Sequence, residues 1–471
     1  MKSRKVREWL SVGFAVVTAL LVAGCAPEMQ EAPKKPNIVF VLTDDQDPES
    51  LRYMPTVQEE LIKKGTTLTE GVVTFPRCCP SRATMLRGQY VHNHGVSGGP
   101  ERNGPYFRSA GLDESTVATW LQDAGYRTAL VGKYLNDYES KTYVPPGWDR
   151  WYAGINREVW ADCFNQNGKE RCYEGKHPDS VLSEKAEKFV RTSEGDPRPL
   201  FLWLAVSAPH NPDFPPATDA NKFSSAPLPK PPSFNEPDVS DKPGWVRDNP
   251  RLSDEKVREL TGLYRVRLRS LQTVDRAIAN LTDALADVGR LENTYIFYFT
   301  DNGYMLGEHR LALTKDVPYV ADTDFPMIVR GPGVPEGASR DELVLNNDLA
   351  PTFADLAGAE GPDFVDGRSL IPLLRGEASQ QWRTAALVEE GRFFNKLDRP
   401  PFAELRTEDR AYIEYGNGER ELYDLDKDPH QLENLAGQRP GEEAVLFSAR
   451  LRELRNCRGA SCRAAEDGTA P

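Results

Sequence analysis

Four short apolar runs that end in polar residues constrain the fold of this chain most strongly. They span residues 37–43 (NIVFVLT), 129–131 (ALV), 200–206 (LFLWLAV) and 294–300 (TYIFYFT). Runs that are apolar on both faces are typical of parallel strands covered by helices. Between two of them, an apolar stripe at steps of three and four residues from Leu271 to Val288 predicts a helix. The pattern predicts an α/β fold, with a large, mostly parallel sheet flanked by helices.

The remaining segments complete this expected organisation. Shorter helices are expected at residues 115–121 and 348–356, with Ser115 or Asp348 near the cap position. Strand-like stretches (AALVEEG, AYIEYG, ELYDL) and a final helix at 442–454 predict a C-terminal α+β subdomain with an antiparallel sheet. We place the main domain at residues 36–376 and this subdomain at 377–465. The Pro-rich stretch 214–250 cannot be regular structure, and either shapes a substrate entrance or wraps the surface.

The N-terminus has the layout of a secretion signal. A basic start precedes a short apolar run, which ends in V-A-G-C at Cys25. The run is too short for a comfortable membrane span, and its ending resembles a bacterial lipobox. We therefore expect a signal peptide at residues 1–24, lipidation of Cys25 and a polar tether over 25–35. Acylation of this kind would attach the exported protein to the bacterial cell membrane.

Charge and cysteine spacing narrow the class of protein further. The net charge of −13 excludes nucleic acid as an expected partner, because binding to phosphate backbones needs clustered Lys and Arg. Outside the cytosol, cysteines at short spacing are expected to pair, which predicts two disulfides, Cys163–Cys172 and Cys457–Cys462. A zinc site is disfavoured because the two pairs lie far apart in the sequence. Cys78 and its neighbour Cys79 are too close to pair readily with each other.

Acidic residues follow two of the apolar runs directly. Asp44 and Asp45 end the first run, and Asp301 and Asn302 end the last one. The carboxyl ends of parallel strands are where α/β folds bind ligands. Calcium and magnesium prefer such oxygen ligands, and adjacent carboxylates are costly unless a cation lies between them. The sequence predicts a site for a divalent cation formed by these four residues.

Cationic and proton-carrying residues accompany these acids beside strand ends and Gly-rich turns. Together they describe a cleft for a tetrahedral anion next to a metal ion. From the residues alone, hydrolysis of a phosphate ester and of a sulfate ester both remain open, and a cysteine nucleophile would need activation. The candidates are Arg77, Arg82, Lys133, His210, His309 and Lys315.

A resemblance to the sulfatase family distinguishes between these chemistries. The stretch CCPSR at residues 78–82, with Leu86 and Gly88 beyond it, resembles the signature C-x-P-S-R-x-x-x-L-T-G. GYRTALVGKYLN (125–136) resembles the second family signature, and TDDQD, APHNP, FTDNG and ELYDLDKDPHQLENLA have counterparts in the same order. The similarity extends from Pro36 to Cys462 and is closest to the glucosamine 6-sulfatase branch. It implies an alkaline-phosphatase-like fold and hydrolysis of a carbohydrate sulfate ester.

The resemblance also assigns roles to individual residues. A formylglycine-generating enzyme would convert Cys78 to formylglycine, whose hydrate attacks sulfur with one hydroxyl and expels sulfate with the other. Arg82 would stabilise the hydrate, and Lys133, His210 and Lys315 would neutralise sulfate oxygens. His210 or Lys315 would protonate the leaving alkoxide, and His309 would lie on the substrate side. The cation, most often calcium with magnesium as the alternative, would be held by formylglycine together with Asp44, Asp45, Asp301 and Asn302.

Two positions depart from the family pattern. Leu135 stands where many arylsulfatases have a histidine, which leaves the base for sulfate elimination open, and Arg87 replaces the threonine of L-T-G, which bears on how efficiently Cys78 is converted. The alternative enzymes are an arylsulfatase, for which an aryl sulfate is the substrate, and a phosphonate or phosphate ester hydrolase. A non-catalytic lipoprotein that binds sulfated glycans is the alternative from another class.

Some residues carry a structural and a functional interpretation at once. His92 and His94 could touch substrate, but a structural role is favoured. Trp148, Trp151 and Tyr152 could stack on a sugar, although core packing is the more frequent fate of such aromatic residues.

Overall fold

The computed structural model describes residues 34–155, 163–210, 215–377, 382–390, 399–437 and 441–468. A ten-stranded sheet forms its centre, in the order β13-β2-β12-β9-β1-β8-β4-β5-β6-β7. Five neighbouring strands run parallel: β9 (Thr294–Thr300), β1 (Asn37–Thr43), β8 (Leu200–Ala205), β4 (Arg127–Gly132) and β5 (Arg150–Gly154). This confirms the predicted α/β fold and each of the four predicted strands.

The outer strands are short. Next to the parallel core, β12 (Met327–Arg330) and β6 (Cys163–Gln166) pair antiparallel to β9 and β5. The sheet ends in β2 (Thr66–Leu68) and β13 (Ala338–Arg340) on one side and in β7 (Lys169–Cys172) on the other. Two small two-stranded sheets lie outside it, formed by β3 (Gly71–Val72) with β14 (Val344–Leu345) and by β10 (Met305–Leu306) with β11 (Ala312–Thr314).

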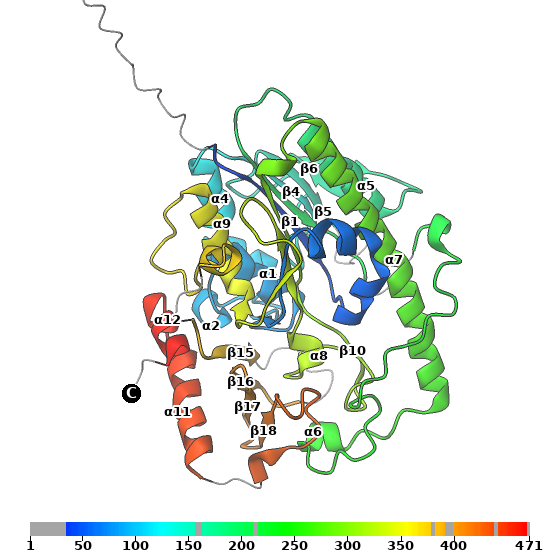
Figure 1. The fold of residues 1–471 in the computed structure, drawn as a ribbon, viewed down its shortest axis with the longest axis vertical. Coiled ribbons are helices and arrows are strands. Elements are labelled where there is room, and N and C mark those ends of the chain that lie inside the picture. Colours follow the sequence, from blue (N-terminus) through cyan, green and yellow to red (C-terminus); the bar gives the residue numbers. More distant parts are fainter. Residues whose placement is uncertain are drawn as a thin grey trace, which may run out of the picture. The chain divides into compact units, whose positions relative to one another are not determined.

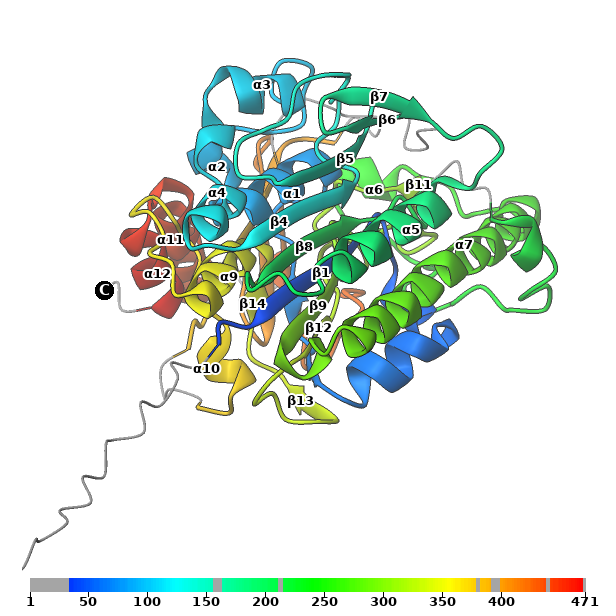
Figure 2. The same cartoon turned by 90° about the horizontal axis from the view of Figure 1, so that it is seen from above.

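Helices cover both faces of the large sheet (Figures 1 and 2). One face carries α5 (Pro178–Arg191) and the long α7 (Asp254–Asp287), and the other carries α1 (Cys78–Arg87), α4 (Val117–Asp123) and α9 (Leu349–Ala357). Phe353 of α9 packs against one aromatic ring from each of three adjacent strands, with centroids 5.0 to 5.7 Å away. These rings belong to Phe40, Phe201 and Phe297, so α9 packs on the three strands whose carboxyl ends carry the site.

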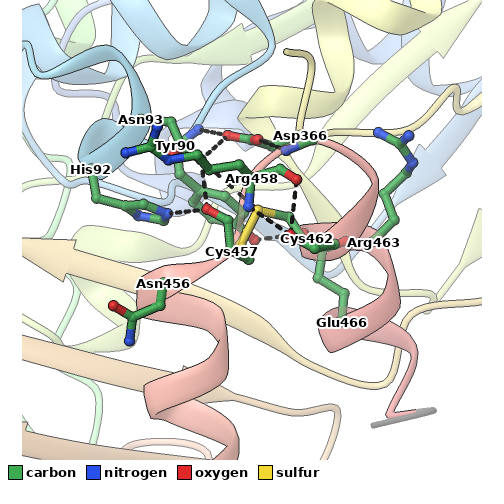
Figure 3. The surroundings of a disulfide bond; sticks show 12 residues. Tyr90, His92, Asn93, Asp366, Asn456, Cys457, Arg458, Cys462, Arg463 and Glu466 are labelled. Atoms are coloured by element: carbon green, nitrogen blue, oxygen red, sulfur yellow. Dashed lines mark hydrogen bonds between the residues drawn. A yellow bond between two sulfur atoms is a disulfide. The ribbon is translucent and has the colours of Figure 1, made fainter. Parts of the chain in front are cut away.

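The C-terminal part forms the predicted antiparallel sheet. Its strands are β15 (Ala386–Glu390), β16 (Phe402–Arg406), β17 (Arg410–Tyr415) and β18 (Arg420–Asp424), followed by α11 (Glu442–Asn456) and α12 (Ala460–Asp467). Both predicted disulfides are present. Cys163–Cys172 joins two paired strands, and Cys457–Cys462 closes the turn between the last two helices (Figure 3). The proposed domain boundary at residue 376 stays a prediction.

Some local predictions need correction. Helix α7 begins at Asp254, well before the predicted stripe. The N-cap of α4 is Thr116, next to Ser115, and the N-cap of α9 is Asp348, as predicted. The Pro-rich stretch is largely irregular over residues 215–250, as predicted, apart from short helical segments at Ala217–Asp219 and Gly244–Arg247 (α6) and a single bridge from Phe234 to Glu308. The predicted signal peptide, Cys25 and residues 26–33 of the tether lie outside the described residues. Over the described ranges, no helix is both long and apolar enough to cross a bilayer.

Candidate active site

The site forms where four parallel strands end. The loops after β1, β9, β4 and β8 carry Asp44–Asp45, Asp301–Asn302, Lys133 and His210, and backbone hydrogen bonds continue from the sheet into them. Asp301 N donates to Thr43 O at 3.1 Å, Asp44 N to Ala208 O at 3.2 Å and Lys133 N to Ala205 O at 2.9 Å. Since these bonds fix the loops to one another, residues far apart in the sequence share one rigid edge.

Cys78 faces this edge from the first turn of α1. Its Sγ lies 3.4 Å from Asp44 Oδ1, 4.0 Å from Asp45 Oδ1 and 2.8 Å from Lys315 Nζ. Every residue of α1 is buried, and the helix ends at Gly88, whose left-handed φ of 68° suits glycine. The amino end of the helix adds partial positive charge beside position 78.

Arg82, one turn further along α1, bridges the two acidic loops. Its Nε donates to Asp301 at 2.7 Å, its Nη2 to Asp44 at 3.2 Å and its Nη1 to the carbonyl of Lys133 at 2.9 Å. All of these side chains are buried except that of Lys133, which is partly exposed. Arg82 therefore holds α1 and three strand ends in one hydrogen-bonded network.

Asp45 gathers the remaining candidates. Its carboxylate accepts from Asn302 Nδ2 at 2.5 Å, pairs with Lys315 Nζ and lies 3.5 Å from His210 Nε2. Lys133 pairs with Asp44 in the same way. The ligand atoms of Asp44, Asp45, Cys78 and His210 all lie within 4.8 Å of one another. The structure thus brings together nine of the predicted site residues: Asp44, Asp45, Cys78, Arg82, Lys133, His210, Asp301, Asn302 and Lys315.

The electrostatics of this cluster match a divalent cation. Burial opposes ionisation of Asp44, yet the charges of Lys133, His210 and Arg82 hold its pKa well below its usual range. Burial and the charge of Asp44 raise the pKa of Asp301 despite its contact with Arg82. Asp301 is therefore the least compensated carboxylate of the cluster, and a divalent ion would supply the positive charge that favours its ionised form.

The donor set passes a second test for such an ion. Oδ1 of Asn302 is buried and has no hydrogen-bond partner within the described part of the chain. A buried amide oxygen without a partner is costly unless a cation or another donor meets it. Three carboxylates and this amide oxygen are the hard ligands that calcium and magnesium bind, so the residues present fit the predicted ion.

The Cys78 thiol itself is a poor nucleophile in this setting. Burial and the neighbouring Asp44 raise its pKa far above the ordinary value, against the opposing charges of Lys133 and Lys315. The thiolate is the reactive form of cysteine. The unmodified thiol is therefore unsuited to nucleophilic attack in this environment.

His309 lies in a different cluster from the one around Cys78. Its Nδ1 shares a hydrogen bond of 2.6 Å with Glu236, and its ring packs 4.3 Å from that of Tyr319. Burial lowers its pKa to about 3, and the charges that act on it come from Lys242, Asp241, Asp428 and His430. The structure gives this residue a packed, hydrogen-bonded environment, and its predicted place on the substrate side stays a prediction.

Other residues that had both a structural and a functional interpretation are packed within the fold. His94 is buried and hydrogen-bonds Thr84 at 2.9 Å, while Trp148 and Trp151 are core residues. Arg87, the departure in the signature, donates to the carbonyls of Leu112 and Ser115 at 2.7 Å each. In the folded chain it ties the end of α1 to the loop before α4.

Two residues near the site escaped the sequence interpretation. Asp316 follows Lys315 and pairs with Arg77, the residue before Cys78, at 2.5 Å. This pair links the lysine loop to the start of α1, and the adjacency of Asp316 to Lys315 was the available signal. Arg267 is fully buried in α7 and donates to the backbone of Asp45. Its charge within the apolar stripe of a helix was the signal in that case.

Comparisons of the sequence with known proteins identify a family and several relatives. The sulfatase family model matches residues 36–359, and the model for the C-terminal part of N-sulphoglucosamine sulphohydrolase matches residues 307–456. N-acetylglucosamine-6-sulfatase of Homo sapiens is 31% identical over 494 residues, which covers 94% of this chain and 89% of that protein. The putative extracellular sulfatase Sulf-1 homolog of Caenorhabditis elegans is 35% identical over 374 residues, or 76% of this chain. The chain spans about half the length of that nematode protein, 52%.

A solved structure shares the fold. A protein in complex with its substrate D-glucosamine-2-N,6-O-disulfate superimposes with a TM-score of 0.78 at 22% identity, and the match covers 93% of this chain and 100% of the other. The prediction from the signature residues is thus confirmed at the level of the family. The site geometry, the family model and the full-length relatives agree that the chain belongs to the sulfatase family.

Proposed function

We propose that this protein hydrolyses a sulfate ester on a carbohydrate, with a 6-O-sulfated glucosamine as its preferred class of substrate. One observation carries the proposal. Cys78 meets Asp44, Asp45, Lys133 and Lys315 at a single buried sheet edge. The similarity to human N-acetylglucosamine-6-sulfatase and to the protein bound to D-glucosamine-2-N,6-O-disulfate supports the choice of sugar.

Two groups that the family implies would complete the site. Formylglycine at position 78 would supply a hydrated aldehyde as the nucleophile toward sulfur. A divalent cation, most often calcium, would supply Lewis acidity and positive charge. Asp44, Asp45, Asp301 and Asn302 would hold the cation.

The basic side chains of this chain would act on the sulfate group and the leaving group. Lys133 and Lys315, which pair with Asp44 and Asp45, would neutralise the anionic sulfate oxygens. His210 or Lys315 would protonate the leaving alkoxide, and the Nζ of Lys315 lies 2.8 Å from Cys78 Sγ. His210, which lies 3.5 Å from Asp45, would orient the substrate from the opposite loop. Arg82 would keep the nucleophile in register with Asp44 and Asp301.

The cellular context belongs to the same proposal. We place the protein outside the cytoplasm, attached to the bacterial membrane by acylated Cys25, after removal of residues 1–24. The extracellular sulfatases among its relatives support export. A formylglycine-generating enzyme would act on the CCPSR segment before or during export.

The decisive experiment examines position 78 and the substrate together. Mass spectrometry of the tryptic peptide Cys78–Arg82 from protein made in a formylglycine-competent host should show the mass deficit of an aldehyde. The same preparation should hydrolyse glucosamine 6-sulfate faster than 4-nitrophenyl sulfate or an aryl phosphonate ester. Faster turnover of an aryl sulfate or of a phosphonate would replace the proposed substrate by one of the alternative ester classes. An unmodified thiol, with sulfated-glycan binding and no turnover, would establish the non-catalytic alternative.

A further inference from the structure

Arg267 lies at the centre of the buried face of α7. Its side chain has 0% exposure, and its Nη1 donates to the carbonyl of Pro209 at 2.8 Å. A second donor, Nη2, bonds the carbonyl of Asp45. The guanidinium carbon lies 4.8 Å from the ring centre of Tyr304. One side chain from outside the sheet therefore contacts the loops that follow β1, β8 and β9.

These three loops are the ones that carry the acidic and histidine candidates. Pro209 immediately precedes His210, and Tyr304 follows Asn302 by two residues. Asp45 has a φ of 63°, in the left-handed region that residues with a side chain rarely adopt. A hydrogen bond to the carbonyl of this strained residue favours the backbone turn that directs its carboxylate at Cys78 and Asn302.

We infer that Arg267 is a positioning residue for cation binding and sulfate-ester hydrolysis at this site. It acts through the backbone of Asp45 and Pro209 and touches no reacting group. Its fork of donors spans two carbonyls at once, which a lysine ammonium cannot reproduce with the same planar geometry. The inference rests on the proposed function only for the turnover readout; the effect on cation binding can be measured without turnover.

The same helix supplies a matched control. Arg269 donates to the carbonyl of Lys222 at 2.7 Å, and Arg265 donates to the carbonyl of Ala226 at 2.9 Å. Both are half-buried arginines that bond backbone carbonyls within residues 215–243, which carry none of the nine clustered site residues. Replacing Arg269 removes the same chemistry from the same helix and leaves the strand-end loops intact.

The test compares R267M, R267K and R269M with the wild type. Calcium is titrated alone while the thermal unfolding midpoint is followed, and kcat and KM are measured on 4-nitrophenyl sulfate with formylglycine content checked by mass spectrometry. R267M should weaken apparent calcium affinity by about 10- to 100-fold and lower kcat more than it raises KM, as loss of support around metal ligands does. R267K should recover part of both losses, and R269M should match the wild type.

Each outcome decides the inference. Wild-type calcium affinity in folded R267M, or an equal loss in R269M, would overturn it. If R267M does not fold, R267K takes its place with the same criteria. Failure of both to fold while R269M folds would assign Arg267 to the fold alone and would also overturn the inference. A wild type that binds calcium but hydrolyses no sulfate ester would refute the proposed function and leave the calcium comparison valid.

Discussion

Because His92 bonds both β15 and Cys457 of the C-terminal part, we expect it to make the free energy of unfolding depend on pH. Its Nδ1 bonds Glu389 of β15 at 3.0 Å, and its Nε2 bonds the carbonyl of Cys457 at 3.1 Å (Figure 3). Both partners are acceptors, so both ring nitrogens must carry a proton for both bonds to form. Burial alone would lower the pKa of His92, but Glu389, the Cys457 carbonyl and the charge of Asp366 raise it above the ordinary value of 6.5.

The magnitude follows from the bond that is lost on deprotonation. A neutral imidazole donates once, so one charge-assisted hydrogen bond disappears at high pH, worth about 1.5–3 kcal/mol. With 18% exposure of the side chain, most of this value should be retained. Because the folded-state pKa is raised, the stabilisation is fully present below about pH 6.5 and is lost as pH rises through the folded pKa.

Denaturant unfolding of the wild type and H92Q at pH 6 and pH 9 measures this effect. The difference in free energy of unfolding between the wild type and H92Q should be larger at pH 6 than at pH 9 by about 1.5–3 kcal/mol. Comparing the two proteins at each pH removes the contribution of ionisations that they share. The chain has six histidines, so H92Q also identifies the His92 signal in an NMR titration. E389Q should bring that pKa down. A His92 pKa below 6.5, or an equal cost of H92Q at both pH values, would refute the reasoning.

Asn302→Ala should weaken the calcium-induced rise in the unfolding midpoint by about ten-fold in calcium concentration, because a hard oxygen ligand is lost; an unchanged titration would remove Asn302 from the cation site. Asp348→Asn should cost about 3–5 kcal/mol in denaturant unfolding, because it leaves Arg383 buried beside a broken ion pair. Asp287→Asn, at an exposed pair, should cost less than about 1 kcal/mol, and equal costs would contradict this. Phe353→Ala should cost about 3–5 kcal/mol through the cavity left among three strands, and a cost below 1 kcal/mol would mean that the neighbouring rings close it.

The sequence was most informative where burial is complete on both faces. The strands at 37–43 and 294–300 have the bounds that their apolar runs predicted, and the polar residues after them meet as expected. The sheet topology forces this meeting, because parallel neighbours end at the same edge. Local pattern and tertiary arrangement agree there.

Buried charged residues account for the elements and contacts that the sequence did not predict. The first half of α7 was missed because its stripe, with Leu260, Tyr264 and Leu268, is interrupted by Arg267. Strand β16 was missed because Glu404 and Arg406 stand at buried positions and neutralise each other at 2.7 Å. His309 looked available from the sequence because its partner Glu236 lies 73 residues away. A partner as distant in sequence as Glu236 is from His309 leaves no local pattern.

The burial of position 78 limits when the proposed conversion of Cys78 could take place. Cys78 is 2% exposed and opens a helix whose ten residues are all buried. A modifying enzyme could not reach this segment once the helix has docked, so the proposed conversion of Cys78 would have to take place while the polypeptide is still extended. Under this proposal, chains that fold first would keep the thiol, and the rate of folding would limit the yield of converted protein.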